Sequence, residues 1–369
     1  MAASDVCFAA VHRQTNEIEY LAGWRIEAAG SALRDCSLIV PTYKRPMEIA
    51  ALMEHLLTHS CDDVPGEVVV VDGSPNDETE KEMQRWSATR ALPFRLQYVR
   101  SKPGLTRQKN VGVDISCGQY LFFLDDDTRT QPGYFRELRT VFATDTAGEI
   151  GAAGGAITNE MGKRPTFRWR VRLALRLVPL AGPMHYDASA ISLPKSLAQP
   201  FTGVKTVDIV PGGACCFRRE VFHKHRFSSF FEGYSNGEDV EMSLRTGREF
   251  KVLWCGSARL THHPAPGGRP PGFTRGRMDL RNRLFIRRRF FPNAPFRASI
   301  RFWADALLLI ALDLILYGRH PRNTFLLRHA AGLLFASFEG FLSPPTATEP
   351  PACRRYALAE ILSESLRKQ

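Results

Sequence analysis

Over its first 150 residues the chain alternates short apolar runs with amphipathic stretches. Apolar runs bounded by polar residues indicate buried strands, whereas apolar residues that recur every three or four positions indicate helices. The pattern predicts strands at 38–40, 68–71, 94–99, 120–124 and 151–158, and helices at 46–59, 77–89, 106–117 and 132–143. Continuous apolar strands that alternate with helices are typical of an α/β fold with a largely parallel sheet.

Beyond residue 150 the regular alternation ends. A basic, partly helical insert runs to about residue 204, and a Pro-Gly-Gly-Ala segment at 211–214 lies within an extended stretch. A further helix is predicted at 238–248, followed by extended chain as far as His262 and His263. We therefore expect three regions: an N-terminal extension (1–34), an α/β domain (35–290) and a helical C-terminal region (291–369).

Polar clusters follow three of the predicted strands. The first strand is followed by Pro41-Thr42-Tyr43, the second by Asp72-Gly73-Ser74, and the 120–124 strand by Asp125-Asp126-Asp127. The carboxyl ends of parallel strands form the usual ligand site of such sheets, so the three clusters should meet. Three adjacent carboxylates repel one another unless a cation compensates them, and hard divalent cations prefer oxygen ligands. A solvated acidic turn is the alternative for this segment.

The chain has a net charge of +11, and the excess is concentrated in two places. The segment 269–328 holds 13 arginines and no lysine, with Asp279, Asp305 and Asp313 as its acids. A second basic cluster lies in the insert, between Lys163 and Arg176. Such patches suit an anionic partner, namely phosphates, nucleic acid or an anionic membrane surface. The eight cysteines form no CxxC pair, and we expect a reducing cytosolic environment with no secretory signal.

The C-terminal region contains two strongly apolar segments, 303–317 and 325–342. Each is interrupted by charged residues, so neither is an uncharged run of roughly 20 residues, the length that spans a membrane. With arginines on both sides, these segments are predicted to be amphipathic helices that lie in a membrane interface. An ordinary packed helical subdomain is the alternative.

Six motifs in this order and spacing resemble the family 2 glycosyltransferases, inverting and metal-dependent enzymes of the GT-A fold. The resemblance covers roughly residues 35–290. The motifs begin at Ser37, Val69, Gly104, Phe123, Gly212 and Glu238, and read SLIVPTYKRP, VVVDGS, GLTRQKN, FLDDD, GGACCFR and EDVEMSLR. One departure is the segment Phe230-Phe231-Glu232-Gly233-Tyr234, where many relatives carry a Gly-Phe-Asp/Glu-Glu sequence.

The resemblance implies a site for a nucleotide-sugar donor. Pro41, Thr42 and Tyr43 would contact the base, and Asp72 would accept a hydrogen bond from it; a turn before Gly73 is the structural alternative for Asp72. Arg107 would approach the diphosphate and Asn110 would order the same helix. The resemblance assigns donor contacts to these residues: Pro41, Thr42, Tyr43, Arg45, Asp72, Arg107, Asn110, Asp125, Asp126, Gly213 and Glu238.

The resemblance also implies a metal ion and a catalytic base. Asp127, with Asp125 and His262, would bind Mg²⁺ or Mn²⁺, which stabilises the charge of a departing nucleoside diphosphate. His263 is the competing histidine. Asp239 would take the proton of the acceptor hydroxyl. Helix capping is the alternative for Glu238-Asp239, because acids in a first turn are favoured by the helix dipole.

We therefore expect an inverting transfer of a sugar to a saccharide or lipid-linked acceptor, in cell-surface polysaccharide synthesis at the inner face of the cell membrane. A nucleotidyltransferase or a Rossmann dehydrogenase fits less well, because the first strand is followed by neither a glycine-rich phosphate loop nor GxGxxG. A non-catalytic nucleic-acid-binding protein or a scaffold is the alternative from another class. The arginines alternate with aliphatic runs rather than aromatic residues, so no nucleic-acid partner is expected.

Overall fold

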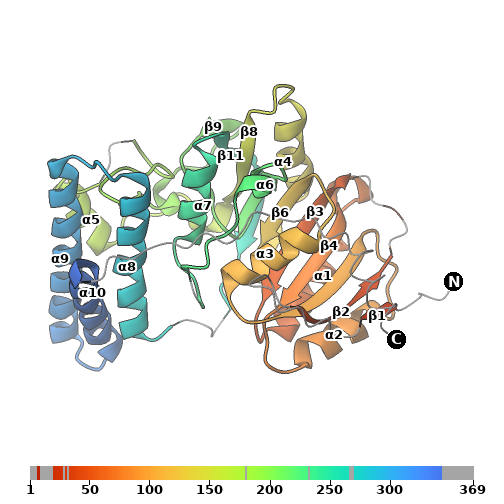
Figure 1. Cartoon of the computed structure of the whole chain (residues 1–369), viewed down its shortest axis with the longest axis horizontal. Helices are drawn as coiled ribbons and strands as arrows, with labels where there is room; N and C mark the ends of the chain where they lie inside the picture. Colours follow the sequence, from red (N-terminus) through yellow and green to blue (C-terminus); the bar gives the residue numbers. More distant parts are fainter. Residues whose placement is uncertain are drawn as a thin grey trace.

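The computed structural model describes residues 6–8, 20–27, 30, 33–178, 181–231, 233–265 and 270–342. A twisted sheet flanked by helices forms one part of the molecule, and a group of long helices stands beside it (Figure 1). Most of the predicted extension 1–34 and the end of the predicted helical region, 343–369, lie outside the described residues. Within the extension, β1 (Val6–Phe8) and β2 (Tyr20–Ile26) pair antiparallel at one sheet edge.

The centre of the sheet consists of four parallel strands. They are β5 (Arg95–Ser101), β4 (Pro65–Asp72), β3 (Leu33–Thr42) and β6 (Tyr120–Leu124), neighbours in that order. The sheet continues through antiparallel β10 (Ala214–Arg218) to β8 (Ile150–Ile157), β11 (Lys251–His262) and β7 (Thr128–Thr130), while β9 (Val204–Thr206) pairs with β11. The predicted α/β fold with a mostly parallel sheet is confirmed.

Helices cover both faces of the sheet, because its strands alternate apolar side chains between two cores. Leu38, Val40 and Phe122 enter the core beneath α1 (Pro46–Leu56), α2 (Glu78–Ser87) and α4 (Tyr134–Ala143). Ile39 and Phe123 point the other way, toward α3 (Leu105–Ile115), α6 (Val221–Lys224) and α7 (Glu238–Thr246). Burial on both faces explains why the central strands are continuous apolar runs.

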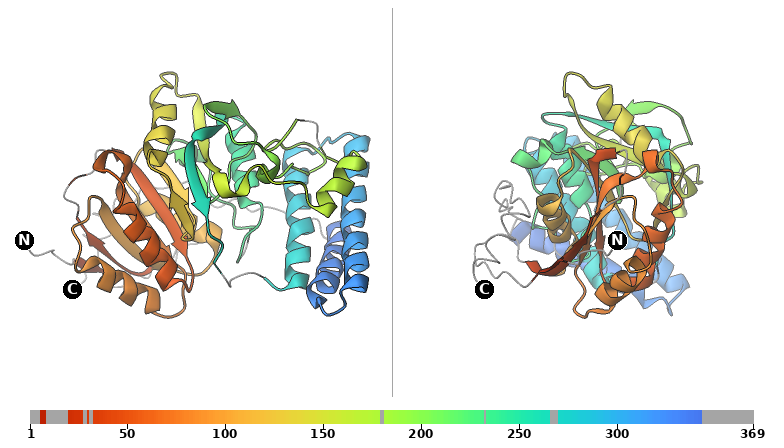
Figure 2. Two further views of the ribbon diagram at one scale, coloured as in Figure 1. Left: turned by 180° about the vertical axis from the view of Figure 1, so that it is seen from behind. Right: turned by 90° about the vertical axis from the view of Figure 1, so that its right-hand side faces the viewer.

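Three long helices form a separate unit. These are α8 (Gly272–Phe290), α9 (Phe296–Arg319) and α10 (Thr324–Leu342), and α10 packs against both others. The helix α5 (Phe167–Ala174), from the insert, lies against α9, as the reverse view in Figure 2 shows. The helical unit thus begins at Gly272, inside the range 35–290 that the sequence assigns to the α/β domain.

Buried ion pairs join α5 to the helical unit. Asp305 and Asp313 of α9 are both fully buried. Asp305 accepts hydrogen bonds from Arg172 Nε at 2.6 Å and Nη2 at 2.9 Å, and Asp313 pairs with Arg168 and with His329. These acids account for the interruptions in the apolar segment 303–317 of the sequence. Among the described residues, we find no helix that combines the length and the apolar character needed to cross a bilayer.

Candidate active site

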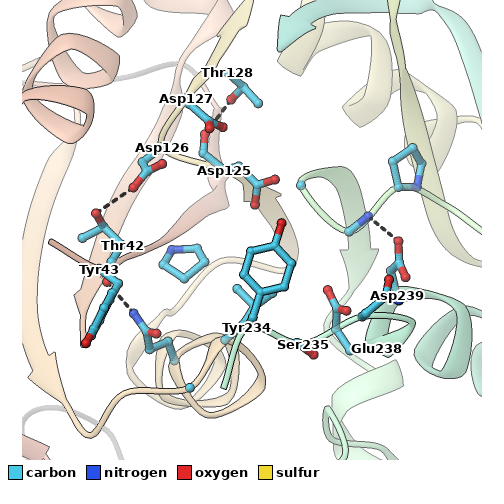
Figure 3. Close-up of a pocket in the computed structure, with 18 of the residues that line it drawn as sticks. Thr42, Tyr43, Asp125, Asp126, Asp127, Thr128, Tyr234, Ser235, Glu238 and Asp239 are labelled. Carbon is cyan, nitrogen blue, oxygen red and sulfur yellow. Dashed lines mark hydrogen bonds between the residues drawn. The ribbon is translucent and has the colours of Figure 1, made fainter. Parts of the chain in front are cut away.

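A cavity of about 650 Å³ lies at the carboxyl ends of β3 and β6, where the sequence predicts that polar clusters meet. The segment 233–239, which includes the first residues of α7, closes its other side. Figure 3 shows two groups of acids on opposite sides, with the ring of Tyr234 between them. Eleven of the predicted site residues line this cavity: Pro41, Thr42, Tyr43, Arg45, Asp125, Asp126, Asp127, Gly213, Glu238, Asp239 and His262.

Asp126 turns toward β3 and α1. Its Oδ2 accepts a hydrogen bond from Thr42 Oγ1 at 2.8 Å, and its Oδ1 lies 2.8 Å from Arg45 Nη1. Burial raises the pKa of Asp126 to about 6 even though Arg45 and Thr42 favour the charged form. Asp126 therefore ties the ends of the two strands together.

Asp125, Asp127 and His262 form a cluster suited to a cation. Each offers one ligand atom, and these atoms lie within 4.8 Å of one another. Burial, opposed in part by Lys109, raises the pKa of Asp125. Two carboxylates and an imidazole are a donor set that Mn²⁺ or Mg²⁺ can use, so the residues present fit a divalent ion.

A second carboxylate holds the His262 ring in place. His262 Nδ1 lies 2.7 Å from Glu160 Oε1, and Nε2 lies 3.2 Å from Asp127 Oδ1. Hydrogen bonds to Asp127 and Glu160 raise the pKa of His262 to about 9, and the contact with His262 lowers that of Glu160 to about 2. A ligating histidine whose other nitrogen contacts a carboxylate is the usual arrangement in metal sites.

Asp239 lies in the first turn of α7, on the wall opposite this cluster. Its Oδ2 accepts a hydrogen bond from the backbone N–H of Gly212 at 3.2 Å, and its Oδ1 accepts one from its own neighbour Val240 at 2.8 Å. Burial and the adjacent Glu238 raise the pKa of Asp239 to about 6, against the opposing effect of Lys109. A half-buried carboxyl group with this pKa is suited to proton transfer near neutral pH.

Two adjacent glycines separate the acid groups. A Cβ atom on Gly213 would lie 2.1 Å from Asp125 Oδ2, and one on Gly212 would lie 2.9 Å from the Cβ of Asp239. Both distances are below van der Waals contact, so a side chain at either position would force Asp125 or Asp239 to shift. The Gly212-Gly213 pair allows the two sets of carboxylates to approach the same backbone.

The comparisons with known proteins agree with this geometry. The model of the family described as glycosyl transferase family 2 matches residues 37–226. The chain belongs to glycosyl transferase family 2. An uncharacterized glycosyltransferase from Haemophilus influenzae is 32% identical over 96 residues, which are 26% of this chain and 30% of that protein. The chain thus spans less than a third of the length of that relative.

Among solved structures, one similar fold is a mannosyltransferase from Pyrobaculum calidifontis, described in complex with GDP-Man and Mn²⁺. Its TM-score is 0.50 at 17% identity, and the match covers 86% of this chain and 90% of that one. At this identity the likeness shows the fold alone. The GT-A type of sheet expected from the sequence is therefore confirmed.

Three predicted donor-binding residues of this family 2 glycosyltransferase do not line the cavity. Asp72 is fully buried, with Oδ1 bonded to the Ser74 backbone and hydroxyl and Oδ2 to Tyr98 Oη at 2.6 Å. Asn110 Nδ2 donates a hydrogen bond to the Phe227 carbonyl, and Asn110 Oδ1 accepts one from the Phe227 backbone N–H, at 2.9 Å each. Arg107 is exposed on α3. Donor contacts by these three residues stay predictions.

The structure adds residues that the sequence did not single out. Lys109 is almost fully buried, and its Nζ lies 3.2 Å from both Glu238 Oε1 and the Gly212 carbonyl. Gln108 Nε2 donates to the carbonyls of Thr42 and Val71 at 2.7 and 2.8 Å. Both lie inside the GLTRQKN motif, on a helix that is buried on nearly every side. Polar residues in this motif were the sequence signal that could have identified them.

Two more contacts near the cavity involve residues to which the sequence analysis gave no role. Glu160 follows the end of β8, the parallel neighbour of β11, so its position beside His262 could have been inferred from strand order. The pair Arg281-Asn282 supports the loop before α7: Asn282 Nδ2 donates to the Asn236 carbonyl at 2.7 Å, and Arg281 stacks over the Phe230 ring at 4.0 Å.

Proposed function

We propose that this enzyme transfers a sugar from a nucleoside diphosphate donor to a hydroxyl of a saccharide or lipid-linked acceptor, with inversion at the transferred carbon. One observation supports the proposal: a single cavity holds a cluster suited to a cation on one wall and a carboxyl group of raised pKa on the other. Separate positions for the leaving group and the base are what a single displacement needs.

Asp239 is proposed as the general base. It accepts the proton of the acceptor hydroxyl as the oxygen attacks, and the bond between the sugar and the diphosphate breaks on the opposite side. The hydrogen bonds from Gly212 and Val240 fix the orientation of the carboxyl group. Lys109, between Glu238 and the Gly212 carbonyl, offsets the negative charge beside the base.

Asp125, Asp127 and His262 are proposed to hold the divalent ion, Mg²⁺ or Mn²⁺. When bound, such an ion offsets the negative charge of a departing diphosphate. The base of the nucleotide is proposed to lie against Pro41, Thr42 and Tyr43, on the same side of the cavity as Arg45. A role in cell-surface polysaccharide synthesis is part of the proposal.

Two substitutions separate these roles. We expect Asp239→Asn to reduce transfer by at least about 100-fold, because a positioned base contributes that much or more, while donor binding stays nearly unchanged. Asp127→Asn should weaken donor binding only in the presence of the metal. Calorimetric titration of both variants with a panel of UDP- and GDP-sugars, with and without Mn²⁺, tests this. Equal loss of donor affinity in both variants would remove Asp239 from the role of base.

We further propose that the helical unit lies on an anionic membrane surface at the inner face of the cell membrane. Exposed apolar side chains recur at seven-residue intervals on α9 as Ile300, Leu307 and Leu314, and α10 exposes Leu334 and Phe338. The three acids between residues 291 and 342 are buried or paired, whereas five arginines are exposed: Arg297, Arg301, Arg319, Arg322 and Arg328. An apolar face with basic residues around it is complementary to anionic lipid headgroups.

A further inference from the structure

A second cavity, of about 270 Å³, lies between the active site and the helical unit. It shares Asn236, Gly237 and Arg275 with the first cavity, so these residues form the boundary between the two. Val240, which follows the proposed base, also lines it. The second cavity therefore adjoins the active site on the side of Asp239, away from the proposed metal ligands.

Three polar groups around this second cavity are buried without a hydrogen bond. They are Tyr186 Oη, Asn282 Oδ1 and Arg283 Nη2, and all three residues line the cavity. Asn282 is 3% exposed, and its Nδ2 is already used by the Asn236 carbonyl. Arg283 Nη2 lies 2.9 Å from Asp305 Oδ2, but without the angle of a hydrogen bond. Tyr186 Oη and Asn282 Oδ1 therefore lack a partner, and buried polar groups of this kind lower the stability of the folded state until a partner arrives.

The charges around the second cavity are predominantly positive. Arg172, Arg275 and Arg283 line it, and Asp279 is the one acid among the described lining residues. Behind the cavity wall, Asp305 contacts Arg172 and Arg283, and Asp279 contacts Arg275. Three guanidinium groups are thus paired with only two carboxylates. An anionic oxygen group would be favoured at this position because it meets donors and excess positive charge together.

We propose that the second cavity binds the part of the acceptor next to the reacting hydroxyl, and that this part is a sugar or ester with an anionic group, a carboxylate or a phosphate. The anion would face Arg283 and Arg275, and a hydroxyl would reach Tyr186 Oη and Asn282 Oδ1. The proposal rests on the function proposed above. At about 270 Å³ the cavity lies just below the usual range for small-molecule sites, so it suits one sugar-sized group rather than a chain.

The decisive variant is Tyr186→Phe, because it removes one unpartnered hydroxyl and no other contact described for that atom. If the hydroxyl binds acceptor, the variant should raise the KM for an acidic acceptor about tenfold, with the donor KM unchanged. The folded state should be as stable as before or slightly more stable, since a buried polar group without a partner is lost. Arg283→Lys keeps the positive charge but loses the paired N–H donors of the planar guanidinium group, and it should also weaken the binding of an acidic acceptor.

Tyr134→Phe is the matched control. Tyr134 Oη is also buried without a partner, but the residue is the first of α4, points into the core and lines neither cavity. Glucuronate, glucose 6-phosphate and glucose are the probes, each titrated by ligand-observed NMR and added to a nucleoside diphosphate release assay. Glucuronate and glucose 6-phosphate distinguish a carboxylate from a phosphate, and glucose reports on the sugar alone.

We expect an acidic probe to bind at least tenfold more tightly than glucose, and Tyr186→Phe but not Tyr134→Phe to reduce this binding. Equal binding of glucose and the acidic probes, equal behaviour of the two tyrosine variants, or a crystal structure with only ordered water at Tyr186 Oη would overturn the inference. Failure of every nucleotide sugar to bind would instead overturn the proposed function. The two failures are therefore distinguishable.

Discussion

At the scale of single residues, the carboxyl groups of the active site differ in their surroundings. Asp126 is tied to Thr42 and Arg45, Asp125 and Asp127 face His262, and Asp239 accepts only backbone N–H groups. These four of the acids around one cavity can therefore serve different purposes, because the partners of each one set its charge and its orientation.

The pKa of Asp239 predicts the acid limb of the pH profile. Burial and Glu238 raise this pKa to about 6, and a base must be deprotonated to accept a proton. We expect kcat/KM to fall about tenfold for each pH unit below 6 and to be nearly constant between pH 7 and 8. Initial rates at saturating metal would measure this. A profile without an inflection between pH 5 and 7 would contradict the assignment.

Gly213→Ala is expected to abolish metal-dependent donor binding. The added Cβ would lie 2.1 Å from Asp125 Oδ2, so this carboxylate must move out of the cluster with Asp127 and His262. Gly318→Ala is the control, because a Cβ there meets nothing within 4 Å and an alanine favours the helix. Titration with Mn²⁺ and a nucleotide sugar should separate the two. Unchanged metal affinity in Gly213→Ala would show that Asp125 is not a ligand.

At the scale of elements, the polar contacts of the helical unit reach the active-site loop. His329 of α10 lies 2.6 Å from Asp313 of α9 and 3.2 Å from Asp279 of α8, and Asp279 accepts a hydrogen bond from Asn236 Nδ2 at 2.6 Å. The carbonyl of Asn236 is held in turn by Asn282. The helices thus fix the loop that separates the two cavities.

The charge of His329 should make stability depend on pH. Burial lowers its pKa, but Asp279 and Asp313 outweigh burial and raise it to about 9, above an unfolded value near 6.5. The stabilisation is therefore complete below about pH 6.5 and is lost as pH rises through 9. We expect the urea midpoint to fall between pH 7 and 9.5.

His329→Gln is the variant that isolates this effect. It should make the decrease in the urea midpoint between pH 7 and 9.5 smaller, because glutamine does not titrate, whereas His262, whose pKa is also raised to about 9, keeps the remaining dependence. His320→Gln, at an exposed position after α9, is the control and should keep the wild-type dependence. The same pH dependence in wild type and His329→Gln would contradict the role of His329.

Much of the fold follows from sequence, but side-chain partners do not. The apolar runs predicted the sheet because they depend on local periodicity, whereas the resemblance to the family 2 motifs supplied the eleven predicted residues that line the cavity. Asp72 and Asn110 were assigned to the donor site, yet their polar atoms meet Tyr98 and Phe227, which come from other elements. The acids of α9 broke an apolar pattern, and their partners on α5, α8 and α10 explain them. Contacts between distant segments leave no periodic signal.

At the scale of the whole molecule, the exposed side of the helical unit can be tested with vesicles. We expect the protein to sediment with vesicles that contain anionic lipid, more weakly as salt increases, and not with neutral vesicles. Leu307→Glu with Phe338→Glu should abolish binding, because both side chains are more than half exposed and would be buried in lipid. Val204→Glu, at an exposed position on β9, is the control. Binding that survives the double substitution would contradict this orientation.

The ion pairs between α5 and α9 have a consequence for dividing this protein into fragments. Arg168 and Arg172 lie in the middle of the chain, and the carboxylates they neutralise lie more than 130 positions later. A chain shortened after Phe290 would keep the arginines and lose both acids, and the excised helices would bury Asp305 with neither Arg172 nor Arg283. Removing one partner of a buried ion pair costs about 3–5 kcal/mol. The sheet-containing and helical regions of this protein therefore cannot be exchanged for others at this boundary unless the insert that carries α5 is exchanged with them.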